Sequence, residues 1–182
     1  LALHHPETRG LRAGYETGRA AARMSRTIWG PADREMTAEA IQRVFDAVGT
    51  ADIVSIYHGN PAAREWFRRA LTWISTIEMN LLFGHELRYF QGTNVYPTEL
   101  ARSLPRTEAG FFVMAEQYLA ALDYGLSVVE VPIVHQARTY GTSSAVGWGR
   151  IWHAQMAVMR FWWRQRVRVA FEALGFSPEA VR

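Results

Sequence analysis

One stretch of the chain constrains the fold most, because it joins a helix, a strand and a turn with almost no linker. Residues 111–124 have the apolar spacing of an amphipathic helix, and Gly125 ends it. Residues 126–134 follow as an apolar run typical of a buried strand. Arg138 and a Gly-x-Ser turn at residues 141–143 come next. An Arg beside a turn with free backbone N–H groups, placed just past a strand, indicates an anion-binding site.

Helix and strand patterns alternate along the rest of the chain. Thr37 is a predicted N-cap, and Gly49 is the predicted end of the helix that follows it. This alternation predicts an α/β sandwich with a mostly parallel sheet between helices. The predicted helices cover residues 11–23, 38–48, 61–83, 98–104, 111–124 and 145–174, and the predicted extended segments cover residues 25–29, 52–58, 88–96 and 126–134.

The composition excludes several classes of protein. The chain has 182 residues, 49% of them hydrophobic, which suits one globular domain with a real core. It has no Cys, so it has no disulfide framework and no thiolate metal ligand or nucleophile. All 20 basic residues are Arg, and the net charge of +3 is too small to indicate nucleic-acid binding by itself. The sequence has neither signal-peptide features nor an uncharged apolar run of about eighteen residues, so we expect a cytoplasmic protein without a membrane span.

The motifs of the C-terminal half resemble a known family. A helix with Glu116, the strand end Val131-Pro132-Ile133 and the R-x-x-G-x-S pattern of residues 138–143 are similar to the acceptor half of the family 2 glycosyltransferases. The subgroup they resemble makes polyprenyl-phosphate sugars and is typified by dolichyl-phosphate mannose synthase. The resemblance implies the α/β GT-A fold.

This resemblance covers nearly the whole chain to about residue 149. It does not include the family's first strand–helix units, which hold the nucleotide base and ribose, so we expect the second half of an enzyme truncated at its N-terminus. The expected organisation is a GT-A domain over residues 1–149 and a C-terminal amphipathic helix within residues 145–182.

Two carboxylates come directly after the first predicted strand. Ligands of open α/β sheets bind beyond the carboxyl ends of strands, and carboxylate oxygens suit hard divalent cations. The resemblance matches Asp33 to the second Asp of the family's D-x-D-x-Q motif and Glu35 to its Gln, while Pro31 stands at the first Asp. It implies that Asp33 and Glu35 hold Mg²⁺ or Mn²⁺ with the donor diphosphate. The alternative is a loop that only leads into the helix capped by Thr37.

Further candidates for donor and phosphate binding precede the acceptor half. Gly10 lies in a run similar to the family's N-x-G-x-G-x-A pattern, which implies contact with the donor. Arg64 and Arg68 share one face of the predicted helix 61–83, and Thr72 lies one turn further on. Arg68 with Thr72 matches the family's Arg-x-x-x-Ser arrangement, which implies contact with a donor or acceptor phosphate. A solvated basic helix face is the alternative.

Glu116 is an acidic residue in the apolar part of the predicted helix 111–124. Such a carboxylate must either be paired or face a cleft. The resemblance implies a Glu near the acceptor, whereas the alternatives are a surface Glu or one paired with Arg138. The segment 85–94 matches the family's D-x-x-S-G-F-R pattern only at Gly92, with Arg88 at the Asp position.

Arg138, Gly141 and Ser143 match the family's R-x-x-G-x-S pattern, which implies a clamp for the acceptor phosphate. Ser144 stands where the family usually has Lys, so Arg138 would carry more of the phosphate's charge.

The last predicted helix has an apolar face with Arg residues beside it. The face consists of Trp148, Trp152, Met156, Met159, Trp163 and Val167, and the Arg residues are Arg150, Arg160, Arg164 and Arg168. Trp and Arg along one apolar stripe are typical of a helix that lies on a membrane surface. A helix packed on the sheet is the alternative.

Taken together, the resemblance implies inverting transfer of a sugar from a nucleotide-diphosphate donor, with the metal on Asp33 neutralising the leaving diphosphate. The expected acceptor is a polyprenyl phosphate or another membrane acceptor, and the expected partners include a membrane surface at its cytoplasmic face but no nucleic acid. A hydroxyl acceptor, as in polysaccharide synthesis, would need Glu116 as its base. A non-catalytic domain that keeps the fold is the other hypothesis, because Pro31 and Ser144 depart from the family pattern.

Overall fold

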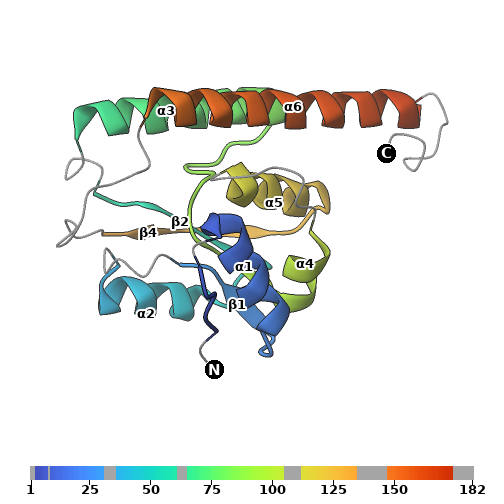
Figure 1. The fold of residues 1–182 in the computed structure, drawn as a ribbon. Helices are drawn as coiled ribbons and strands as arrows, with labels where there is room; N and C mark the ends of the chain where they lie inside the picture. The colour runs from blue at the N-terminus through green and yellow to red at the C-terminus, as the bar shows by residue number, and fades with distance from the viewer. Residues whose placement is uncertain are drawn as a thin grey trace. The chain divides into compact units, whose positions relative to one another are not determined.

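The computed structural model describes residues 3–7, 9–30, 36–60, 65–104, 112–134 and 147–173, which form a mixed α/β protein (Figure 1). The chain divides into two compact units, Leu1–Thr142 and Ser143–Arg182. The helices of the first unit are α1 (Gly10–Ala21), α2 (Ala38–Ala47), α3 (Trp66–Phe83), α4 (Thr98–Ser103) and α5 (Phe112–Asp123). Its strands are β1 (Arg26–Ile28), β2 (Ile53–His58), β3 (Asn94–Pro97) and β4 (Val128–Ile133). The described part of the second unit forms α6 (Trp148–Ala173).

The four strands form one sheet in the order β1-β3-β2-β4. Strand β3 is antiparallel to both of its neighbours, and only β2 and β4 pair in parallel. The prediction of a mostly parallel sheet is therefore wrong. Because β3 is reversed between β1 and β2, the strands β1, β2 and β4 still run in one direction.

The segment before β3 lies close to β2, at the end of the sheet where the chain enters β3. Gly92 lies so close to β2 that a side chain at this position would collide with the backbone carbonyl of Ile56. The chain thus returns to the carboxyl-terminal half of β2, the end at which it left that strand. It then enters β3 there, and the strand has to run in the opposite direction.

One face of the sheet packs against α2 (Figure 1). Thr37 caps this helix as predicted, because its hydroxyl oxygen accepts a hydrogen bond of 3.1 Å from the Ala40 N–H. The core on this face is aliphatic, since every second strand residue points towards α2. It consists of Ala40, Val44, Val54, Ile56, Val95, Val131 and Ile133.

The opposite face of the sheet packs against α5, and α1 packs on α5 through Tyr15 (Figure 1). The prediction that α5 is amphipathic is wrong, because its residues are buried without a break from Phe112 to Ala121. This layer contains polar groups as well. The Tyr15 hydroxyl donates to Gln117 Oε1 at 2.5 Å, and Asn94 Nδ2 donates to the Tyr96 hydroxyl at 3.0 Å.

Several predicted elements differ from the structure in extent or burial. The extended segment predicted for residues 88–96 forms a strand only over Asn94–Pro97. Helix α3 begins at Trp66 rather than Pro61, because Glu65 before it has extended backbone. Strand β4 is only half-buried and lies at an edge of the described sheet. Pro132 is tolerated in β4 for that reason, since a Pro without an N–H fits an edge strand but not a central one.

Candidate functional site at the carboxyl end of the sheet

The common direction of β1, β2 and β4 gives the sheet one end from which three connecting segments leave. Residues 29–35 follow β1, residues 59–65 follow β2, and residues 134–147 follow β4. Segment 84–93 reaches the same end, because it leads into β3 from there. In open α/β sheets this end is where ligands bind.

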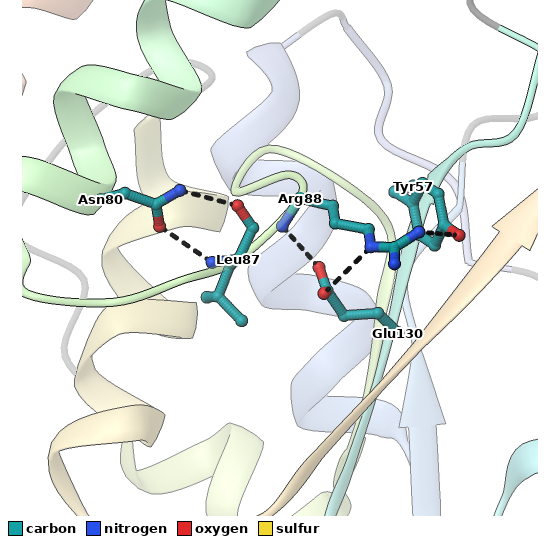
Figure 2. A network of polar contacts seen from close by, with 5 residues as sticks. All are labelled: Tyr57, Asn80, Leu87, Arg88 and Glu130. Atoms are coloured by element: carbon teal, nitrogen blue, oxygen red, sulfur yellow. Dashed lines mark hydrogen bonds and ion pairs between the residues drawn. The ribbon is translucent and has the colours of Figure 1, made fainter.

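Segment 84–93 is anchored at its start by α3. Gly84 has a φ of 73°, a left-handed conformation that ends the helix and favours Gly. Asn80, in the last turn of α3, then holds Leu87 by two hydrogen bonds (Figure 2). The side-chain amide donates to the Leu87 carbonyl at 2.8 Å, and its oxygen accepts from the Leu87 N–H at 2.9 Å. This pair of bonds fixes the backbone just before Arg88.

Arg88 is held by side chains from two neighbouring strands (Figure 2). Its backbone N–H donates to Glu130 Oε1 at 2.7 Å, and its guanidinium Nε lies 3.9 Å from Glu130 Oε2. Its Nη1 donates to the Tyr57 hydroxyl at 2.6 Å, with the guanidinium 4.8 Å from the centre of the Tyr57 ring. The Arg88 side chain remains 65% exposed, whereas that of Glu130 is 19% exposed. The arrangement presents an oriented cation at the surface, which is suited to an anion.

The end of segment 84–93 is fixed by close backbone packing. A Cβ on Gly92 would meet the Ile56 carbonyl and would also lie 3.1 Å from the Tyr89 ring. Tyr89 in turn contacts His58, the last residue of β2, with ring centres 5.1 Å apart. A side chain at position 92 is therefore excluded by sterics, and Gly fits there.

His85 lies in segment 84–93, and its surroundings shift its pKa. Burial lowers the pKa of His85, which favours the neutral imidazole, and the charge of Asp123 opposes this shift in part. Among the residues that the structure describes, no group of three His, Asp or Glu side chains could hold a metal ion. The predicted metal ligands Asp33 and Glu35 lie outside the described residues.

Arg68 and Thr72 lie on one side of α3, as predicted from their spacing. The Thr72 hydroxyl donates to the Arg68 backbone carbonyl at 2.9 Å, so it is engaged within the helix. Both residues are half-buried. Arg64 lies outside the described residues.

Glu116 is completely buried, with 0% of the residue exposed. The alternative that placed it on the helix surface is therefore wrong.

Gly10 is the first residue of α1 and has a φ of 82°, which favours Gly. No described atom lies within 4 Å of the position that its Cβ would take. Arg138, Gly141 and Ser143, which form the predicted phosphate clamp, lie outside the described residues.

The contacts of Arg88 with Tyr57 and Glu130 were not predicted from the sequence. The three residues come from distant parts of the chain and meet only because β2 and β4 pair in register. The available signal was Arg88 itself, which replaces the Asp of the family pattern. No family model matches the chain, and no curated protein matches it either.

Proposed function

We propose that the chain is the acceptor half of a GT-A-type glycosyltransferase that transfers a sugar from a nucleotide-diphosphate donor to a polyprenyl phosphate, with inversion. The observation that carries the proposal is the shared direction of β1, β2 and β4. Because of it, the segments that contain Asp33 and Arg138 both start at the end of the sheet where Arg88 is held. A donor diphosphate and an acceptor phosphate both require such cationic and metal-binding groups.

The burial of Glu116 favours a phosphate acceptor over a hydroxyl acceptor. A hydroxyl needs a general base in reach of its proton, and Glu116, the best candidate for a base, has no exposed surface. A phosphate oxyanion is already a nucleophile and needs no base. It attacks the anomeric carbon in line as the bond to the diphosphate breaks, and the nucleotide diphosphate leaves.

In this proposal the Arg residues serve the acceptor phosphate, and two carboxylates serve the donor diphosphate through a metal ion. Arg138 with the turn at Gly141 and Ser143 binds the acceptor phosphate, and Arg68 assists it from α3. Arg88 adds a cation whose position is fixed by Glu130 and Tyr57. It compensates for the Lys that Ser144 replaces in the family pattern. Asp33 and Glu35 would hold Mg²⁺ or Mn²⁺, which would neutralise the leaving diphosphate.

The deciding experiment measures sugar transfer to a short-chain polyprenyl phosphate from radiolabelled nucleotide sugars, with Mn²⁺ or with a chelator. The assay uses both this chain and the complete reading frame that encodes it. Asp33→Ala should abolish the metal-dependent turnover of an active wild type. Full activity of this variant, or activity that a chelator leaves unchanged, would remove the metal site from Asp33.

Two other outcomes identify the alternative functions. Transfer to sugar hydroxyls but not to polyprenyl phosphate would contradict the proposed acceptor. Donor or phosphate binding by calorimetry without any turnover in the complete protein would indicate a non-catalytic domain.

A further inference from the structure

Helix α6 exposes a stripe of large apolar side chains along its length. Trp148, Met159, Trp152, Trp163 and Met156 fall within an arc of about 80° when residues are placed 100° apart around the helix. All five residues are exposed, and Trp152 and Trp163 have 65% and 64% of their surface open to solvent. A stripe of three Trp and two Met residues in water is costly, and such exposed apolar patches mark interaction sites.

The charges of α6 indicate what covers this stripe. The helix contains five Arg residues and a single acidic residue, Glu172. At 100° per residue, Arg160 lies about 40° and Arg164 about 80° beyond one edge of the stripe. Together with Met159, Trp162 and Trp163 they line a shallow hollow with an apolar floor. The apolar floor is complementary to the acyl chains of lipids, and the Arg side chains at its rim are complementary to the phosphate headgroups of anionic lipids.

We propose that the Trp–Met stripe of α6 docks the protein on an anionic lipid bilayer surface. Indole rings favour the boundary between headgroups and acyl chains, and the flanking Arg side chains contact lipid phosphates. In the described parts of the chain, no helix is long and apolar enough to cross a membrane. The proposed contact places α6 parallel to the surface, because the stripe runs along the length of the helix. The proposal deepens the proposed function and rests on it in one respect, because a polyprenyl-phosphate acceptor is itself anchored in a bilayer.

Helix α3 in the first unit carries a second stripe of the same kind. Its exposed residues are Trp66, Trp73, Ile74, Ile77 and Leu81, which fall within an arc of about 100°. The buried Met79 lies on the opposite side of the helix, and the exposed Arg69 lies beside the stripe. This stripe also combines Trp, aliphatic residues and Arg, so its contribution to lipid binding is tested separately from that of α6.

The test is co-sedimentation of the 182-residue chain with vesicles of neutral phosphatidylcholine, with and without about a third of phosphatidylglycerol. No donor sugar and no polyprenyl phosphate are present, so the result is independent of glycosyl transfer. We expect binding to the anionic vesicles that falls with added salt, because screening weakens the attraction of exposed Arg residues. Replacing Arg160, Arg164 and Arg168 with Gln should weaken binding on the order of a hundredfold at low salt.

Apolar variants test the stripes separately. Trp152→Ser with Trp163→Ser should reduce binding in both low and high salt, and Trp66→Ser with Trp73→Ser should reduce it as well. Phe45→Ser with Arg43→Gln is the matched control, because it removes an exposed aromatic residue and an exposed Arg from α2. Circular dichroism of each variant shows whether it is folded.

Three outcomes would overturn the proposal for α6. The wild type could ignore anionic vesicles at low salt, or the α6 variants could bind as tightly as the control variant. Light scattering could instead show a dimer of the wild type that the Trp152 and Trp163 variant breaks, without vesicle binding. The stripe would then be the interface with a second copy of this chain.

Discussion

The backbone N–H of Arg88 donates a hydrogen bond of 2.7 Å to Oε1 of Glu130, which ties segment 84–93 to strand β4. The same carboxylate also lies near the Arg88 guanidinium. The segment that leads into β3 thus depends on one side chain in β4, and the side chain of Arg88 is oriented as a consequence.

We therefore expect Glu130→Ala to lower the free energy of unfolding by about 1.5–3 kcal/mol, the usual value for a hydrogen bond to a charged group. Arg88→Ala is the matched variant, because it keeps the backbone N–H bond and removes only the contacts of the mostly exposed Arg88 side chain with Glu130 and Tyr57. The exposed ion pair among these contacts is worth about 0–1 kcal/mol. Urea denaturation of both variants measures the difference. Equal losses in the two variants would show that the backbone bond does not hold the segment.

Gly92→Ala should be strongly destabilising, because its methyl group would collide with the backbone carbonyl of Ile56, which cannot move aside as a flexible side chain could. Forcing a group into such packing costs typically about 1–3 kcal/mol. Gly14→Ala is the control, since Gly14 lies inside α1 with open space around it and should gain roughly 0.5–1 kcal/mol. Thermal unfolding of both variants measures these changes. A Gly92→Ala variant as stable as the wild type would contradict the prediction.

The hydrogen bonds between Asp52 and Ser127 should make the free energy of unfolding depend on pH in the acidic range. The Ser127 hydroxyl and N–H donate to Asp52 Oδ2 at 2.6 and 2.9 Å, and these bonds hold the pKa of Asp52 below its usual value. A carboxylate with a lowered pKa stabilises the fold above its unfolded pKa of about 4, and this contribution is lost as the pH falls through the folded value.

The difference in unfolding free energy between the wild type and Asp52→Asn should therefore be constant above about pH 5 and shrink below about pH 4. Ser127→Ala removes the hydroxyl donor and should reduce the acid-dependent part of that difference. A difference that does not change between neutral and strongly acidic pH would contradict the assignment.

Arg138→Ala tests the acceptor clamp. Losing a charge-assisted contact to a bound phosphate costs roughly 1.5–3 kcal/mol, so the acceptor KM should rise or kcat should fall about tenfold or more. Donor binding should remain nearly intact. Steady-state kinetics with each substrate varied in turn separates the two effects, and a loss of donor affinity instead would place Arg138 at the nucleotide.

Local signals in the sequence predicted the helices and strands, because the residues that begin and end them act over one turn of chain. Thr37 caps α2 and Gly125 follows α5 with a positive φ, as expected. The direction of β3 could not be predicted in the same way. It depends on Gly92 packing against Ile56, two residues that are far apart in the sequence.

The same difference between local patterns and contacts of distant residues applies to the candidate site. The spacing of Arg68 and Thr72 was sufficient to place them on one side of a helix. The contact of Arg88 with Tyr57 and Glu130 depends on the register of β2 against β4, which no local pattern encodes. The full burial of Glu116 likewise follows from how α5 packs between the sheet and its neighbours.

Pro132 also affects how the sheet meets other molecules. The backbone N–H groups of Ile53 and Gly59 donate to the carbonyls of Ser127 and Ile133. The backbone N–H and C=O groups of the odd-numbered residues from 127 to 133 therefore point towards β2. The backbone groups of residue 132 point away from β2, towards the open edge of the strand. Because residue 132 is Pro, it has no N–H group that could donate there. A strand from another chain that paired along β4 would leave one of its carbonyls without a donor. The β4 edge of the sheet that the described residues form is thereby protected against strand addition and the aggregation that follows from it.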